Sequence, residues 1–214
     1  MLHRLLDFIA PRKSLTGTYG EWVTDVEWRQ MRAYAQKIDR TELRKRGIEE
    51  LNELVAAYSY DASPLLRTAL QRFKYRGAHE LVEHLGTLMT DGARLLEVSD
   101  DSVLCPVPLH WTRRFQRGFN QSLLLAEHAS DILSIPVHDC LRRVRPTGHQ
   151  AHRKRAERMT AMHDAFCVHR NTTLSSHIIL VDDVATTGAT LDACASALKF
   201  AGVEKVDALV VALG

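Results

Sequence analysis

Four apolar residues near the C-terminus, residues 178–181, lead directly into two adjacent aspartates. The run Ile-Ile-Leu-Val has no polar face, so it predicts a strand that is buried on both sides, as in the middle of a parallel sheet. Asp182 and Asp183 stand where this strand is expected to end. A short turn rich in Thr and Gly follows, and apolar residues at helical spacing come after it. The predicted order is therefore strand, acids, turn and helix.

The turn of residues 185–190 has the composition of an anion site. Ligands of open α/β sheets bind outside the carboxyl ends of the strands, and the amides of a helix N-terminus favour an anion. We expect Gly188 to let a phosphate approach the backbone, and the threonine hydroxyls to add hydrogen-bond donors. The predicted phosphate-binding residues are Ala185, Thr186, Thr187, Gly188, Ala189 and Thr190.

Asp182 and Asp183 have a different predicted role, because carboxylates repel a phosphate. As acceptors they suit the vicinal hydroxyls of a ribose, or a divalent metal and its waters. Acids and turn together predict a site for a ribose 5-phosphate. A single Asp that ends a strand, or a single Thr that caps a helix, would have a purely structural explanation. The combination over 13 residues favours the ligand site.

Length, charge and cysteine spacing limit the class of protein. The 214 residues suit one α/β domain with a small extension, and a net charge of +2 does not by itself indicate nucleic acid. The 4 cysteines form no C-x-x-C pair, which argues against a zinc ribbon and a disulfide framework and predicts buried thiols. We expect a cytoplasmic protein, because residues 1–10 are too charged for a signal peptide and no apolar run approaches the ~18 residues of a membrane span.

Strands and helices alternate along the rest of the chain without hairpin signals, which predicts an α/β fold with a right-handed, mostly parallel, doubly wound sheet. The first 60 residues or so are the least regular part, with no predicted chemistry. The expected helices cover residues 42–46, 48–55, 63–77, 79–96, 122–133 and 190–201, and the expected strands cover residues 102–108, 135–141, 165–168, 177–181 and 206–213.

Two segments are strongly basic. Arg113, Arg114 and Arg117 follow the predicted strand of residues 102–108, and residues 142–158 carry seven Arg or Lys residues against one Glu. Such clusters commonly form a solvated surface or a disordered loop. Their positions favour a second interpretation, in which the first segment binds an anion and the second is a lid that closes over phosphates.

Residues 178–190 resemble the phosphoribosyl pyrophosphate (PRPP) motif of type I phosphoribosyltransferases, in which the acids bind ribose hydroxyls and the loop binds the 5-phosphate. Over residues 58–213 the chain is similar to the ComF family of competence-associated proteins with a phosphoribosyltransferase domain. The motifs that carry this resemblance, besides the PRPP motif, are Phe73-Lys74-Tyr75-Arg76-Gly77, Pro106-Val107-Pro108, Arg117-Gly118-Phe119-Asn120-Gln121 and residues 150–166.

The resemblance implies a type I phosphoribosyltransferase-like domain over residues 58–214, after an N-terminal extension of residues 1–57. It implies PRPP or a nucleotide as ligand and displacement of pyrophosphate from C1 of the ribose. Asp182 and Asp183 would be the catalytic pair, with Mg²⁺ brought by PRPP and contacted by these acids. The pyrophosphate and lid contacts would be Arg113, Arg114, Arg117, Gln150 and Arg155.

The chain departs from the family in three places. Family members usually begin with a zinc ribbon of paired cysteines, and here the expected C-x-x-C-Trp element has Thr24 and Glu27 at its cysteine positions. We therefore expect no zinc in residues 1–57. In the predicted lid, Arg153 stands where the family tends to have Leu, and Ala161 stands where it tends to have Asn.

A second function class competes with the enzyme. A module of the same fold could bind a nucleotide or single-stranded DNA, with the competence machinery of DNA uptake as partner, and transfer nothing. Few aromatic residues accompany the basic segments, which favours electrostatic contact over base stacking. An ATPase is excluded because no G-x-x-x-x-G-K-[ST] loop is present. The sequence identifies neither the acceptor nor the oligomeric state.

Overall fold

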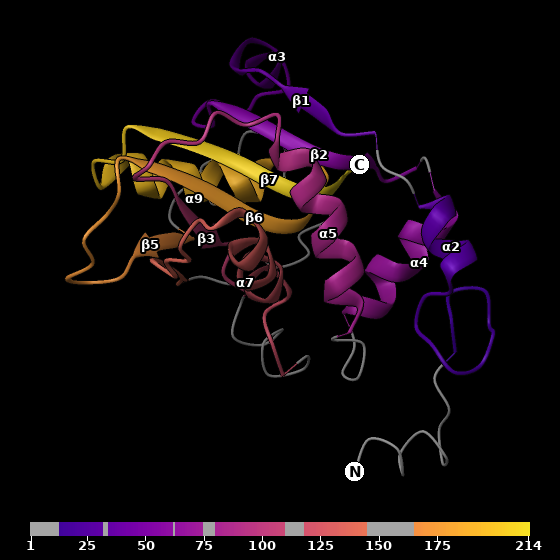
Figure 1. Cartoon of the computed structure of the whole chain (residues 1–214). Helices are drawn as coiled ribbons and strands as arrows, with labels where there is room; N and C mark the ends of the chain where they lie inside the picture. Colours follow the sequence, from indigo (N-terminus) through magenta and orange to yellow (C-terminus); the bar gives the residue numbers. More distant parts are fainter. Residues whose placement is uncertain (1–12, 32–33, 62, 75–79, 110–117, 145–164) are drawn as a thin grey trace.

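The computed structural model describes residues 13–31, 34–61, 63–74, 80–109, 118–144 and 165–214. A five-stranded sheet with the order β1-β2-β7-β6-β3 forms the centre of this part of the chain (Figure 1). Strand β1 is antiparallel to β2, and the other neighbours are parallel. The prediction of an α/β fold with a mostly parallel sheet is confirmed. The strands are β1 (Gln36–Ile38), β2 (Glu53–Ser59), β3 (Val103–Pro106), β6 (His177–Ala185) and β7 (Lys205–Leu213).

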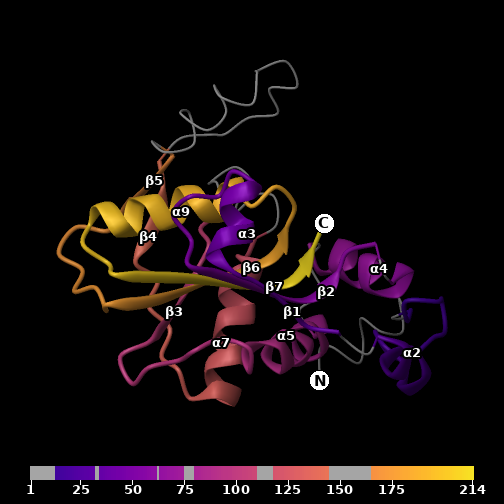
Figure 2. The same cartoon turned by 90° about the horizontal axis from the view of Figure 1, so that it is seen from above.

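Helices cover both faces of this sheet (Figure 2). Helices α5 (Leu81–Ala93) and α7 (Gln121–Leu133) pack together on one face. Helices α9 (Ala189–Phe200) and α3 (Arg40–Lys45) lie on the other. Helix α4 (Pro64–Phe73) packs beside α5, and a two-stranded sheet of β4 (Leu141–Arg143) and β5 (Phe166–Val168) lies next to α9.

Strand β6 is buried on both faces, as its sequence predicted. Ile178 and Leu180 point into the core under α9, whereas Ile179 and Val181 point into the core under α5 and α7. None of the four is more than 1% exposed. A strand enclosed in this way can offer chemistry to solvent only at its end. Cys105, Cys140 and Cys194 are also buried and free, which confirms the prediction of buried thiols for three of the four cysteines.

Two predictions about secondary structure are wrong. The helix expected over residues 48–55 is absent, and residues 53–59 form β2 instead, paired with β7 in the register Leu54↔Ala208. Five consecutive residues of β2, 54–58, are buried, and such a short apolar run does not distinguish a helix from a strand. The strand expected over residues 135–141 is reduced to a single bridge between Val137 and Leu104. Residues 141–143 form β4 instead and pair antiparallel with β5, a pairing that was not predicted from the sequence.

The predicted domain boundary at residue 57 falls inside β2, and both β1 and β2 belong to the same sheet as β6 and β7. Within the described ranges, no helix combines the length and the apolar character that a bilayer crossing requires.

A buried glutamate organises the N-terminal loop. Glu27 is only 2% exposed and lies in helix α2 (Asp25–Gln30), which Thr24 caps in a capping box. Its carboxylate accepts hydrogen bonds from Ser14 Oγ (2.8 Å), the Thr16 amide (2.6 Å) and the Thr24 amide (2.8 Å). Burial alone would raise the pKa of Glu27, but these hydrogen bonds together lower it to about 2. The Glu27 carboxylate therefore holds residues 14–16 against α2.

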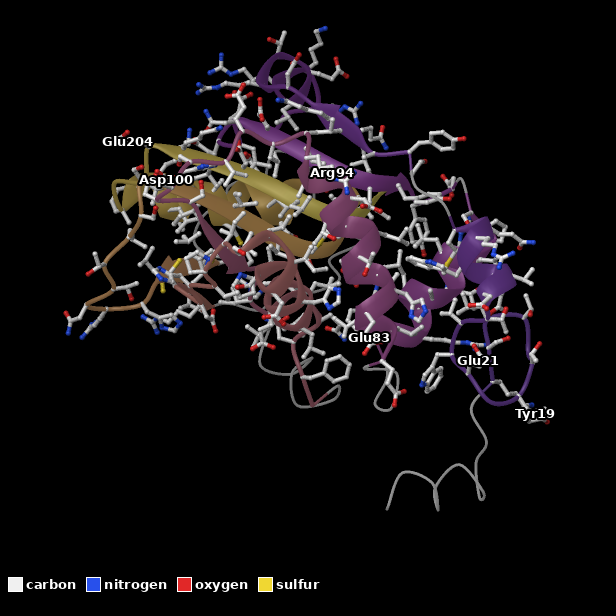
Figure 3. The ribbon with its side chains drawn as sticks, in the orientation of Figure 1. Tyr19, Glu21, Glu83, Arg94, Asp100 and Glu204 are labelled. Carbon is white, nitrogen blue, oxygen red and sulfur yellow. The ribbon has the colours of Figure 1, made fainter. Side chains whose placement is uncertain are left out.

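Helix α4 anchors the same loop to the rest of the protein. The Arg72 guanidinium donates to the carbonyl oxygens of Lys13 and Ser14, both at 2.7 Å. The tip of the loop, marked by Tyr19 and Glu21, projects away from the sheet (Figure 3).

We predict that Glu27→Gln lowers the free energy of unfolding at pH 7 by about 3 kcal/mol. Each unit by which the pKa is lowered corresponds to about 1.4 kcal/mol of stability. In addition, the NH₂ group of the glutamine side chain is a donor and would oppose the donor N–H of Thr24. The folded-state pKa lies below the ordinary value of 4.5, so this stability is present above pH 4.5 and is lost as the pH falls toward 2. Urea unfolding of the wild type and of Glu27→Gln between pH 3 and 7 measures this difference in stability. The exposed Glu21 provides the control variant, Glu21→Gln. Equal stability of wild type and Glu27→Gln at pH 7 would contradict this role.

Candidate functional site

The two aspartates lie where the neighbouring strand has already ended. Strand β3 stops at Pro106, which is opposite Val181 of β6. Strand β6 continues beyond the acids to Ala185, still paired with β7, so the expectation that it ends at the acids is wrong. On the β3 side, however, Asp182 and Asp183 have no strand beside them. A cavity opens at the carboxyl ends of the strands, where β3 has ended and β6 continues.

This cavity has a volume of about 350 Å³, which is near the lower end for small-molecule sites. It lies among the residues that follow β2 and β3, the start of α7, and the β6–α9 turn. Its lining residues are Tyr60, Lys74, Val107, Pro108, Leu109, Gln121, Ser122, Arg143, Asp182, Asp183, Val184, Thr186 and Thr190. The structure thus brings both predicted acids and two threonines of the predicted phosphate turn to one space.

Two hydrogen bonds hold the Asp182 carboxylate in place. Its Oδ1 accepts a hydrogen bond from Ser122 Oγ at 2.8 Å and another from the amide of Asp183 at 2.9 Å. Ser122 is placed by the first turn of α7, which Asn120 caps through the Ser122 amide. Burial, together with the charge of Asp183, raises the pKa of Asp182 to about 7, and the hydrogen bonds and Lys74 oppose this only in part. A carboxyl group with such a pKa is typical of a functional site.

Asp183 has a carboxylate oxygen that no hydrogen bond within the described residues uses. Its Oδ2 lies 3.5 Å from Lys74 Nζ, an ion pair at the end of α4. The same oxygen is buried and has no hydrogen-bond partner among the described residues. Buried carboxylate oxygens normally have such partners, and one without them in a cavity wall suits a ligand hydroxyl or a metal ion.

The β6–α9 turn has a conformation that requires glycine. Thr186 and Thr187 are exposed, and Gly188 has φ +73°, in the left-handed region, as the N-cap of α9. A Cβ at Gly188 would come within 2.3 Å of Ile48 Cδ1. The sequence predicts that this glycine lets a phosphate approach the backbone, and close packing against Ile48 is a second reason for glycine here.

Asp192 fixes the segment that contains Ile48. Its Oδ1 accepts hydrogen bonds from the amides of Glu49 (3.0 Å) and Glu50 (2.8 Å). Since Asp192 lies in the first turn of α9, it holds residues 48–50 against the beginning of this helix. The N-terminal part of the chain thereby supports the shape of the β6–α9 turn.

The remaining predicted site residues are Arg113, Arg114, Arg117, Gln150 and Arg155, and they lie outside the described residues. Five polar cavity residues were not assigned a role from the sequence. Lys74, Gln121 and Ser122 lie in or beside motifs that carried the family resemblance, and Arg143 belongs to the second basic segment. Tyr60 had no sequence signal, because only the pairing of β2 with β7 brings it to this edge.

The described residues contain no group of three or more His, Cys, Asp and Glu side chains arranged to bind a metal by themselves. Carboxylate oxygens of Asp182 and Asp183 are the hard ligands available in the cavity.

Comparison with known proteins gives two relatives. Competence protein F of Haemophilus influenzae is 32% identical to the chain over 148 residues, which cover 66% of the chain and 65% of that protein. Competence protein ComFC of Bacillus subtilis is 34% identical over 139 residues, which cover 65% of the chain and 55% of that protein. These two relatives support a ComF family assignment.

The matches cover less than two thirds of either curated relative. No family model matches the chain. The resemblance seen in the motifs is confirmed by these relatives at the level of the family.

We predict that Asp182→Asn makes the protein more stable at pH 8, by about 2 kcal/mol, because it removes a charge that the folded state disfavours. The folded-state pKa is raised from 3.8 to about 7, so the cost of ionising Asp182 develops as the pH rises from 4 to 7. The gain should therefore be smaller at pH 5 than at pH 8. Urea unfolding at both pH values measures it, with Asp131→Asn on the exposed side of α7 as the control. An Asp182→Asn protein that is less stable at pH 8 would contradict the assignment.

Proposed function

We propose that this protein binds PRPP, or the ribose 5-phosphate part of a nucleotide, together with Mg²⁺ at the carboxyl edge of its sheet. The observation that carries the proposal is the placement of Asp182, Asp183, Thr186 and Thr190 around one cavity of about 350 Å³, next to the N-terminus of α9. A ribose 5-phosphate has a vicinal diol at one end and a dianion at the other. The two aspartates match the diol, and the threonines at the N-terminus of α9 match the dianion.

Each part of the site has a separate task in this proposal. Asp183 accepts hydrogen bonds from the ribose hydroxyls, and Asp182, held by Ser122, completes the acidic wall. The hydroxyls of Thr186 and Thr187 and the first-turn amides of α9 receive the 5-phosphate. Gly188 keeps the turn close to the ligand. These groups orient the sugar and its phosphate before any chemistry takes place.

The same carboxylates fit Mg²⁺, because Asp183 Oδ2 is a buried oxygen without a hydrogen-bond partner among the described residues. When bound, the ion would neutralise charge on phosphate oxygens of the ligand. Lys74 and Arg143 add positive charge to the cavity wall.

We further propose a type I phosphoribosyltransferase-like fold, supported by the position of the acids and the β6–α9 turn in a mostly parallel sheet. In transfer, the bond from C1 of the ribose to pyrophosphate breaks, a bond from C1 to the acceptor forms, and the acceptor loses its proton. The protein supplies no nucleophile in this reaction, and its contribution is positioning and charge.

The names of the two relatives, competence protein F and competence protein ComFC, support a role in natural competence, the uptake of DNA. They also support the second candidate, a nucleotide- or single-stranded-DNA-binding accessory protein that transfers nothing. The two candidates use different residues. Ribose binding depends on Asp183, whereas binding of a DNA backbone depends on positive charge and is weakened by salt.

We predict that PRPP with Mg²⁺ raises the melting temperature of the wild type, because a ligand that binds only the folded state stabilises it. Asp183→Asn should remove most of this increase, and Asp100→Asn, at the opposite edge of the sheet (Figure 3), should leave it unchanged. Differential scanning calorimetry with and without ligand measures the effect. An equal increase in wild type and Asp183→Asn would show that the ribose assignment is wrong.

The same proteins distinguish the two candidates. A phosphoribosyltransferase should release pyrophosphate from PRPP when a panel of bases and amines is offered, and Asp183→Asn should abolish the release. The accessory protein should instead bind single-stranded DNA, lose affinity steeply with salt and tolerate Asp183→Asn, because carboxylates repel a phosphate backbone.

A further inference from the structure

The cavity is lined by an aromatic side chain that has no role in the ribose 5-phosphate site proposed above. Tyr60 directly follows β2, and among the described residues that line the cavity it is the only aromatic one. Its amide donates to the carbonyl oxygen of Leu213 at 2.7 Å, which continues the pairing of β2 with β7 by one residue. The Tyr60 backbone is therefore fixed by the sheet.

The Tyr60 ring is also held in place. The Arg67 guanidinium lies 5.4 Å from the centroid of the ring, and Arg67 is itself tied to Asp61 by an ion pair of 3.0 Å. The ring is partly buried against the core under α5. An aromatic side chain that is already ordered loses little conformational entropy when a ligand packs on it.

Tyr60 lies close to the predicted phosphate turn. Gly214 separates Tyr60 from Thr186, and a Cβ at Gly214 would be 3.7 Å from Tyr60 Cβ and 3.6 Å from Thr186 Cγ2. The Gly214 amide donates to the carbonyl oxygen of Ala185 at 2.8 Å, so the three segments meet at one point. Since Gly214 has no side chain, this residue places none between Tyr60 and Thr186.

The order of strands gives the cavity two walls of different character. Asp182 and Asp183 on β6 lie between β3 and β2. The apolar residues Val107 and Leu109, which follow β3, form one wall of the cavity, and Tyr60 follows β2. A ribose whose hydroxyls bind Asp183 and whose phosphate binds Thr186 would share this cavity with Tyr60. A planar heterocycle attached to that ribose can stack on an aromatic ring, and stacking tolerates any base because every base has a π-face.

We propose that Tyr60 is a base-stacking residue and that the cavity prefers a ribose 5-phosphate that carries a planar heterocycle, as in a nucleoside 5′-monophosphate. This inference rests on the proposed function, because it requires the ribose 5-phosphate to bind at Asp183 and the β6–α9 turn. It names the ligand class of that site, a nucleotide, and a residue that selects it.

The test compares ribose 5-phosphate with adenosine 5′-monophosphate, by isothermal titration calorimetry with Mg²⁺. We expect the wild type to bind the nucleotide about tenfold more tightly than ribose 5-phosphate, because stacking of the base on an aromatic ring adds binding energy of this size. Tyr60→Phe should keep this preference and Tyr60→Leu should lose it, while the affinity for ribose 5-phosphate stays the same in all three proteins. Tyr34→Leu, at a tyrosine that is 89% exposed outside the cavity, is the matched control and should keep the preference.

The outcomes separate this inference from the proposed function. If ribose 5-phosphate binds but the wild type shows no preference for the nucleotide, or if Tyr60→Leu keeps the preference, the inference is overturned and the proposed function stands. If ribose 5-phosphate does not bind to the wild type, both are overturned. Binding of ribose 5-phosphate also reports that each variant is folded. Should Tyr60→Leu fail to fold, Tyr60→Met replaces a ring with a flexible side chain of similar bulk and gives the same test.

Discussion

The burial of β6 on both faces is the constraint on which the rest of the structure depends. Ile178, Ile179, Leu180 and Val181 fill two cores at once, one under α9 and one under α5 and α7. No side chain of this run can take part in chemistry, so the polar groups are confined to the carboxyl end of the strand. Because β3 stops opposite Val181 while β6 continues to Ala185, the step between the two strands creates the space in which Asp182 and Asp183 are presented.

Placing charge in that space lowers stability, and the surroundings limit the cost. Ser122 and the Asp183 amide donate to Asp182, and Lys74 is paired with Asp183, yet the pKa of Asp182 remains raised to about 7. A folded protein that keeps an unfavourable carboxyl group gains nothing in stability from it, which is the usual condition of a binding or catalytic group. Glu27 shows the opposite case, because its three hydrogen bonds lower its pKa and make its charge stabilising.

Much of the central fold could be predicted from sequence because local patterns decide it. The unbroken apolar run of β6, the Ser63-Pro64 start of α4 and the Asn120 start of α7 each have a local physical cause that tertiary contacts do not override. Strand β2 could not be predicted, since its apolar run acquires a strand conformation through pairing with β1 and β7. For the same reason Tyr60 could not be placed in the site. The role of Ile48 behind Gly188 depends on Asp192, which is 143 residues away along the chain from Glu49.

The central claim is that one cavity binds both ends of a ribose 5-phosphate, with the hydroxyls on the acids and the phosphate on the β6–α9 turn. A crystal structure of the protein with PRPP and Mg²⁺ tests it most directly. The account predicts ligand hydroxyls within hydrogen-bond distance of Asp183 and the 5-phosphate within hydrogen-bond distance of the amides of residues 187–190. A bound ligand whose phosphate lies away from this turn, or whose ribose does not contact Asp182 or Asp183, would contradict it.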